Sequence, residues 1–279
     1  MEISSITKTG LFYKIKFDDG NIFKFHESVI IKYGFIRKKI TISEVALQNA
    51  LKDNEYYLAL DKGINYLSSL KSKYDTYLYL RKTFSEVVSK KVIDKLIEMK
   101  LLNDLEFAKL YVLSMIKKQY GPNKIYEDLK SKRISDEEIS LALSLYDNKD
   151  MEINCLKLME KYLPTLKKNS SLLGKKKLQN YLLNKGFSNN IITTVIEKNY
   201  FLLDNINDED ELLKVHYQKL LKAKKSKDDK EFKNKAIRSL CSKGFPLSKV
   251  LKIVEGRNKK YDQRQNWWQF YVLSWSRKD

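Results

Sequence analysis

The pattern of apolar and polar residues divides the chain into a short N-terminal part with a period of two and a longer part with a helical period. Residues 11–17, LFYKIKF, alternate as expected for a strand with one buried face. The DDGN that follows suits a tight hairpin turn into a second strand, IFKF. With a further strand over residues 3–9, the pattern predicts a three-stranded antiparallel sheet near residues 1–25.

Helical signals begin directly after this sheet. HESVIIKYG predicts a short helix that ends at Gly34, with His26 at the junction between sheet and helix. TISEVALQNALKD predicts a second helix, which Ser43 can cap. From about residue 54 onward apolar residues keep helical spacing, and the chain has only 9 glycines and 3 prolines to interrupt helices.

One 15-residue pattern recurs four times, although its first copy is one residue short. A period near 50 residues indicates a repeat protein in which each copy is one supersecondary unit. In each copy a helix ends near a leucine, an apolar side chain anchors a turn, and a capping residue opens the next helix. Gly186 and Gly244 supply the left-handed residue in two of these turns. The leucines are Leu80, Leu129, Leu182 and Leu240, the anchors are Phe84, Ile134, Phe187 and Phe245, and the capping residues are Ser85, Ser135, Ser188 and Pro246.

The pattern therefore predicts a mainly α protein of tandem three-helix repeats in a curved, elongated array, with a small antiparallel β-sheet at the N-terminal end. A third helix should follow the first and last turns, at residues 104–118 and 265–278, which share the sequence YVLS. The tryptophans of the second segment are expected in the core, with exposed stacking residues as the alternative. The predicted parts are residues 1–53 for the sheet and first helices, then repeats over 54–120, 121–168, 169–226 and 227–279.

The chain is strongly basic, with a formal net charge of +19. Such a charge favours a polyanionic partner, most often a nucleic acid. AT-rich codon usage is the competing explanation, because lysine far outnumbers arginine. The uneven distribution favours a functional surface: residues 214–260 hold 16 basic and four acidic residues, whereas residues 135–160 hold two lysines and seven acids.

Sequence motifs for catalysis and metal binding are missing. There is no P-loop, Rossmann glycine pattern, HExxH, EF-hand loop or zinc-ligand spacing, and only two histidines. We therefore expect neither an enzyme nor a bound cofactor. The acidic run at residues 204–211 lacks the glycine of a calcium loop, and its acids are better explained as favourable charges at a helix N-terminus.

The expected location is the cytoplasm. No run of 18 apolar residues predicts a transmembrane helix, and the first residues do not resemble a signal peptide. Cys155 and Cys241 have no metal-type spacing, so we expect buried thiols in a reducing compartment.

The segment KKQYGPNKIYEDLKSKR, residues 117–133, is the most specific candidate site. Gly121 is expected to end one helix and Pro122 to open the next. Basic residues interleaved with Tyr120 and Tyr126 suit a phosphate backbone with unpaired bases. A solvated helix face explains the same pattern equally well.

Residues 84–112, FSEVVSKKVIDKLIEMKLLNDLEFAKLYV, followed by YGPNKIYEDLKSKRISDEEI, resemble the core of the RecX family, regulators of the RecA recombinase. The family pattern has L-x-D/N-D-x-x-F-A-x-x-Y-V, then a basic stretch with G-P and L-x-x-K-G-I/V. Arg133 stands where the family usually has glycine, and the tail after residue 256 departs from the family. The N-terminal DDGNIFKFHESVIIKYGFIRKKIT is similar to the sheet segment of longer, Firmicute-like members. The matching residues are Leu102, Asn103, Asp104, Phe107, Ala108, Tyr111 and Val112, then Gly121, Pro122, Ile125, Leu129, Lys132 and Ile134.

This resemblance implies a helical-repeat regulator that binds RecA and its filament on single-stranded DNA. Such proteins lie along the helical groove of the filament and hinder ATP hydrolysis, strand exchange and coprotease activity. We expect a monomer with no membrane partner; direct contact with single- or double-stranded DNA is left open. The alternative is a helical-repeat or helix-turn-helix nucleic-acid-binding protein that acts without RecA. The residues that we hypothesise to contact RecA or DNA are Arg81, Lys82, Lys117, Lys118, Tyr120, Lys124, Lys130, Lys132, Arg133, Lys175, Lys176, Lys177 and Lys185.

Overall fold

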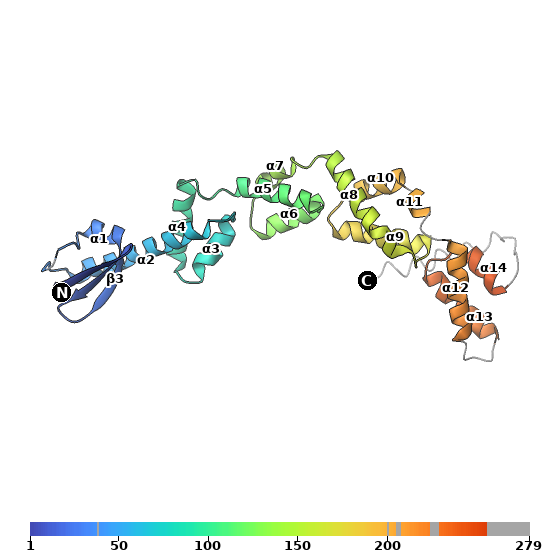
Figure 1. The fold of residues 1–279 in the computed structure, drawn as a ribbon, viewed down its shortest axis with the longest axis horizontal. Coiled ribbons are helices and arrows are strands. Elements are labelled where there is room, and N and C mark those ends of the chain that lie inside the picture. Colours follow the sequence, from blue (N-terminus) through green and yellow to red (C-terminus); the bar gives the residue numbers. More distant parts are fainter. Residues whose placement is uncertain (38, 200, 205–207, 224–228, 256–279) are drawn as a thin grey trace. The chain divides into compact units, whose positions relative to one another are not determined.

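The computed structural model describes residues 1–37, 39–199, 201–204, 208–223 and 229–255 (Figure 1). Contacts divide the chain into two compact parts, Met1–Asp147 and Asn148–Asp279, and each part is described by itself. The predicted helix at residues 265–278, with its tryptophans, lies outside the described residues. None of the described helices is both long enough and apolar enough to span a membrane.

The N-terminal sheet is antiparallel with strand order β1-β2-β3, which confirms the prediction. Ile15 on the central strand pairs with Ile6 on one side and Phe23 on the other. Gly20 has a φ of 86°, so the second hairpin turn uses the left-handed conformation that glycine favours. The strands are β1 (Ile3–Thr9), β2 (Phe12–Phe17) and β3 (Ile22–His26).

Two helices, α1 (Glu27–Tyr33) and α2 (Glu44–Tyr66), pack against this sheet around a core that includes Phe17, Phe25 and Leu47. His26 lies at the predicted junction, where its Nδ1 accepts a hydrogen bond from the Ser28 amide at 3.2 Å. Gly34 ends α1 with a φ of 66°, and Ser43 caps α2, both as predicted.

Four groups of three helices follow, and each packs around one of the predicted turns. The first consists of α2, α3 (Lys73–Arg81) and α4 (Glu86–Glu98), and the second of α5 (Asp104–Lys117), α6 (Pro122–Ser131) and α7 (Asp136–Leu143). The third consists of α8 (Asn148–Tyr162), α9 (Ser171–Asn184) and α10 (Asn189–Lys198), and the fourth of α12 (Glu209–Lys222), α13 (Asp229–Ser242) and α14 (Leu247–Glu255). A 3₁₀ turn, η1 (Leu163–Leu166), follows α8, and the short α11 (Phe201–Asp204) follows α10.

In each group the first helix, which we call the leading helix, packs against the two helices that follow it in the chain. Thus α5 contacts α6 and α7, although the predicted boundaries place it with the helices before it. The reason is that the leading helix supplies apolar side chains to the core of the following turn, as Leu213 of α12 does beside Phe245. The curvature of the predicted array stays a prediction.

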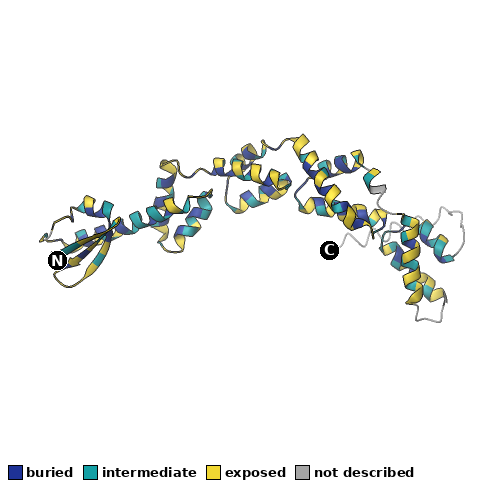
Figure 2. Ribbon diagram, viewed as in Figure 1, coloured by how far each residue is buried: buried dark blue, intermediate teal, exposed yellow. Residues whose placement is uncertain are grey.

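The repeated residues have the structural roles predicted for them. The four leucines at the start of the pattern are 0% exposed, and the turn anchors Ile134, Phe187 and Phe245 are buried. Figure 2 shows buried and exposed residues alternating along the helices. Phe84 is only half-buried, which matches the weaker pattern of the first copy. The hydroxyls of Ser85, Ser135 and Ser188 each accept a hydrogen bond from an amide in the first turn of the next helix.

The turns differ in how they reach the left-handed conformation. Gly186 and Gly244 have φ values of 92° and 81°, as predicted, and Arg133 takes the same conformation at 59°. The prediction that Gly121 ends a helix is wrong. The exit from α5 falls on Gln119, with a φ of 62°, whereas Gly121 is extended and precedes α6. The cause is Pro122, because a residue before proline is pushed out of the helical region.

Candidate functional site

Much of the basic segment at residues 117–133 is neutralised by nearby acids. Three of its lysines form ion pairs, and the Tyr126 hydroxyl donates a hydrogen bond to Asp136 at 2.7 Å. Three of the six basic side chains in this segment therefore already have an acid partner. The pairs are Lys124 Nζ–Asp128 Oδ1 at 2.8 Å, Lys130 Nζ–Asp136 Oδ1 at 2.9 Å and Lys132 Nζ–Asp75 Oδ2 at 2.7 Å.

Two lysines of this segment have no acid partner among the described residues. Lys117 and Lys118 at the end of α5 are exposed, and neither forms an ion pair with any described residue. Tyr120, which follows them, is half-buried. A contact with an external anion at this segment would therefore be made by Lys117 and Lys118 in the first place.

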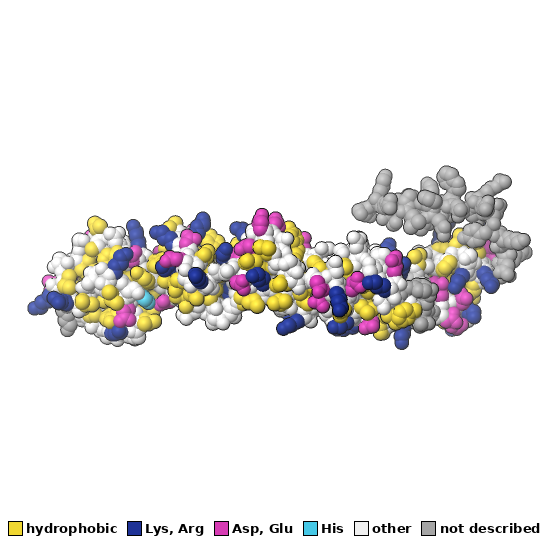
Figure 3. All heavy atoms as spheres, turned by 90° about the horizontal axis from the view of Figure 1, so that it is seen from above, with side chains coloured by type: hydrophobic (Ala, Val, Ile, Leu, Met, Phe, Trp, Pro, Cys, Tyr) yellow, Lys and Arg dark blue, Asp and Glu magenta, His cyan; other side chains and the backbone are white. Residues whose placement is uncertain are grey.

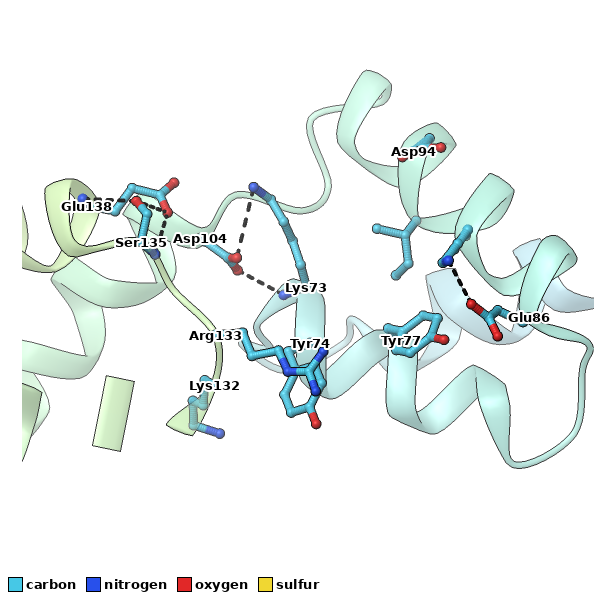
Figure 4. Close-up of a pocket in the computed structure, with 12 residues that line it drawn as sticks. Lys73, Tyr74, Tyr77, Glu86, Asp94, Asp104, Lys132, Arg133, Ser135 and Glu138 are labelled. Carbon is cyan, nitrogen blue, oxygen red and sulfur yellow. Dashed lines mark hydrogen bonds and ion pairs between the residues drawn. The ribbon is translucent and has the colours of Figure 1, made fainter. Parts of the chain in front are cut away.

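Lys132 and Arg133 line a cleft of about 520 Å³ between the first and second groups (Figure 4). The Arg133 guanidinium lies 4.3 Å from the centre of the Tyr74 ring, and Lys132 Nζ lies 5.6 Å from that of Phe107. Arg133 thus links the two groups through Tyr74 of α3, and Lys132 links them through its ion pair with Asp75, whereas its contact with Phe107 lies within the second group. Four basic and four acidic side chains line the cleft, so it carries no net charge: Lys73, Lys90, Lys132 and Arg133 against Glu86, Asp94, Asp104 and Glu138.

Asp104 forms the second link across this joint. Its Oδ1 accepts a hydrogen bond from the Lys73 amide at 2.8 Å, at the first residue of α3, and its Oδ2 lies 3.9 Å from Lys73 Nζ. The carboxylate is 5% exposed, and this burial raises its pKa. Burial also disfavours ionisation of the Asp75 carboxyl, but hydrogen bonds from Lys132 and Ser72 outweigh it and lower the pKa of Asp75.

The sequence pattern did not predict this role of Asp104. The only sequence feature that marked Asp104 was its position as an acid at the start of a predicted helix, within the family pattern. Such an acid is normally interpreted as a charge that favours its own helix dipole. Here the carboxylate instead accepts from the N-terminus of a helix in the preceding group.

A similar joint links the third and fourth groups. Glu209, the first residue of α12, accepts a hydrogen bond from the Ser171 amide at 3.2 Å, at the start of α9. The buried Ser170 hydroxyl donates to the carbonyl of Lys243 at 2.5 Å, in the turn before α14. In both joints, therefore, an acid that opens a leading helix binds the N-terminus of the middle helix in the group before it.

The remaining predicted contact residues are scattered over α3 and α9. Arg81 donates to the Phe84 carbonyl at 2.6 Å and so helps to close its own turn, while Lys82 is exposed. On α9, Lys177 donates to the Asn169 side chain at 2.7 Å, and Lys185 Nζ lies 5.7 Å from the centre of the Tyr181 ring. Arg81, Lys82, Lys175, Lys176 and Lys177 are exposed and form no ion pair with a described residue, but of these only Lys82, Lys175 and Lys176 also lack a hydrogen bond to one.

The surface as a whole mixes both signs of charge. On the face seen in Figure 3, dark blue lysines and arginines lie close to magenta carboxylates in each part of the chain. Within the described ranges, no group of three or more histidine, cysteine or acidic side chains could hold a metal ion. The arrangement offers separate lysines to an anionic partner.

Family models for RecX proteins match much of the helical region. The model of the second three-helix domain of RecX matches residues 103–143, which correspond to the second group. The model of the third three-helix domain matches twice, at residues 152–196 and 208–254, which correspond to the third and fourth groups.

Whole-chain comparisons point the same way. "Regulatory protein RecX" of Bacillus cytotoxicus is 32% identical over 233 residues, covering 82% of this chain and 85% of its own length. The protein of the same name in Bacillus mycoides is also 32% identical, with the same coverage. A solved structure, "Crystal structure of regulatory protein RecX", is similar in fold, with a TM-score of 0.62 at 24% identity; it covers 70% of this chain and 98% of its own.

Proposed function

This chain belongs to the RecX family of regulatory proteins, and from that premise we propose that it binds RecA and its filament on single-stranded DNA. It lies in the groove of the filament and inhibits ATP hydrolysis, strand exchange and coprotease activity. It acts in the cytoplasm as a monomer and catalyses no reaction of its own.

The observation that carries this proposal is the match to RecX relatives over 82% of the chain. The structure adds a physical reason. Successive three-helix groups present exposed lysines that form no ion pair with a described residue, such as Lys117 and Lys118 in the second group and Lys175 and Lys176 in the third. Cations that no internal acid neutralises are suited to an anionic surface.

The net charge of +19 favours a second candidate, a nucleic-acid-binding protein that acts without RecA. The two candidates predict different relative affinities for the RecA filament and for bare DNA. A RecA regulator binds the filament more tightly than bare DNA, whereas a general DNA-binding protein has similar affinity for both and loses it steeply with salt.

The deciding experiment measures RecA ATPase activity on single-stranded DNA with and without this protein. We expect inhibition, and we expect the double charge reversal Lys117→Glu/Lys118→Glu to weaken it several-fold. The matched control is Lys14→Glu/Lys16→Glu, which makes the same change in charge on the exposed face of β2. Unaltered ATPase activity with the wild-type protein would contradict the proposed function. Equal effects of both variants would contradict the role of Lys117 and Lys118.

A further inference from the structure

Two boundaries between helical groups are closed by the same pair of chemical groups. In each, the first residue of the leading helix is an acid, and it accepts a hydrogen bond from the amide of the first residue of the middle helix in the group before it. Asp104 accepts from the Lys73 amide at 2.8 Å between the first and second groups (Figure 4). Glu209 accepts from the Ser171 amide at 3.2 Å between the third and fourth groups. We call this pairing the acid–amide joint.

The middle helices at these joints also share a cap. Ser72 and Ser170, which precede α3 and α9, are 0% and 2% exposed. The hydroxyl of each accepts a hydrogen bond from the amide of the third residue of its helix, Asp75 or Leu173. Because a helix begins with several amides that have no partner within the helix, the amide of the first residue is left for the acid of the next group.

The boundary between the second and third groups has different residues at the same three positions. The middle helix α6 begins with Pro122, and its cap is Gly121, which makes no side-chain hydrogen bond. The leading helix α8 begins with Asn148. Proline has no amide hydrogen to donate, glycine has no hydroxyl, and asparagine has no negative charge. These residues therefore cannot form an acid–amide joint.

The connection through this boundary is very short. Backbone hydrogen bonds tie the chain to α7 as far as Tyr146, whose amide donates to the Leu143 carbonyl at 2.9 Å. Since α8 begins at Asn148, only Asp147 lies between. The division of the chain into two compact parts falls at the same point, after Asp147. A hinge needs only a few residues at the end of an element that can absorb a change in backbone dihedral angles.

We propose that the protein bends at Asp147 and that the acid–amide joints confine bending to this point. The first and second groups then move as one body, and the third and fourth groups as another. Asp104 and Glu209 act as positioning residues, because each fixes the orientation of its own group against the group before it. The inference does not rest on the proposed function, since it concerns the free protein and holds for any binding partner.

The test is double electron–electron resonance on the full chain, with pairs of nitroxide labels in a Cys155→Ala/Cys241→Ser background. One pair, at Glu137 and Asn190, spans the second and third groups. The control pair, at Lys91 and Glu137, spans the first and second groups, and all three positions are exposed. We expect the distribution of distances to be several-fold broader for the first pair than for the control pair.

Substitutions can open one joint and install another. Asp104→Ala should broaden the distribution of the control pair and leave that of the pair at Glu137 and Asn190 unchanged. Pro122→Ser supplies an amide hydrogen and Asn148→Glu supplies a carboxylate, so the double variant has both halves of a joint. It should narrow the distribution between the second and third groups several-fold. Asn148→Glu alone should leave that distribution broad, because Pro122 cannot donate a hydrogen bond to the new carboxylate.

Two results would overturn this inference. The first is a wild-type distribution that is as narrow between the second and third groups as between the first and second. The second is a double variant that has the circular dichroism spectrum of the wild type but a distribution as broad as that of Asn148→Glu alone, which would remove the role of the joints. The first comparison needs no substitution at a joint, so it decides the bend even where a variant misfolds. Failure of the proposed function is seen separately, as RecA ATPase activity that the wild-type protein leaves unchanged.

Discussion

The buried carboxylate of Asp104 accepts a hydrogen bond from the N-terminus of α3, a helix of the preceding group. Replacing it with alanine leaves the Lys73 amide without its acceptor in a partly buried site. We expect Asp104→Ala to lower the free energy of unfolding of the first two groups by about 1–3 kcal/mol. Urea denaturation followed by circular dichroism measures this change.

The control for Asp104 is its neighbour Glu106, in the same turn of α5. Glu106 is exposed and pairs with Lys109 at 3.1 Å on the helix surface. Glu106→Ala should therefore cost only about 0.2–0.5 kcal/mol. Equal costs for the two substitutions would show that Asp104 stabilises only its own helix.

Cys155 illustrates how burial controls the reactivity of a thiol. It is fully buried in the third group, as predicted from the sequence, and burial raises its pKa to about 12. At pH 8, well below this pKa, only about one thiol in 10⁴ is ionised. In a Cys241→Ser background we expect almost no reaction with Ellman's reagent until the protein unfolds. Cys241 is half-buried and should react faster in a Cys155→Ser background, so fast native labelling of Cys155 would contradict its burial.

At the scale of helices and turns, local signals made the repeat predictable. The glycines, capping serines and buried leucines of each turn act within one or two turns of chain, so their spacing shows their role directly. The same logic located the N-terminal sheet and the helix that ends at Gly34. It failed at Gly121, because the proline next to it changes which residue ends α5.

Contacts between distant residues could not be predicted in this way. Lys132 pairs with Asp75, 57 residues earlier, so its spacing gave no sign that its charge is neutralised. The same limit applied to the joint between Glu209 and Ser171, which are 38 residues apart. The sequence alone therefore could not distinguish lysines that have an acid partner from lysines that have none among the described residues.

The turn at Gly244 combines a backbone requirement with close packing. Its φ is 81°, and a Cβ atom would lie 2.7 Å from the Ser170 hydroxyl and 3.1 Å from the Leu173 amide nitrogen. Gly20 has a similar φ of 86° with nothing within 4 Å of that position. Gly20→Ala should thus cost only the conformational strain of about 1–2 kcal/mol.

We expect Gly244→Ala to destabilise the fourth group by at least about 1 kcal/mol more than Gly20→Ala destabilises the sheet, because the new methyl group also overpacks the joint. Differential scanning calorimetry of both variants measures the two shifts. Similar losses would mean that the turn of the fourth group can move away from α9 without cost.

The whole molecule has several apolar cores in place of a single one. Separate clusters of buried residues lie under the sheet, in the first group, in the third group and in the fourth group. The described contacts between the first and second groups are few and largely polar, such as the Lys132–Asp75 pair. In such a chain, stability is set by each group and by its nearest neighbours.

This arrangement predicts local effects for a core substitution. Phe187 is 0% exposed in the third group, and Phe187→Ala should destabilise that group by about 3–5 kcal/mol. In hydrogen exchange followed by mass spectrometry, amides of residues 148–199 should lose protection, because their local unfolding becomes easier. Amides of β1–β3 and α1, whose core contains Ile15 and Phe25, should keep theirs. Equal loss of protection in both regions would show that the chain unfolds as one cooperative unit, and it would contradict the independence of the cores.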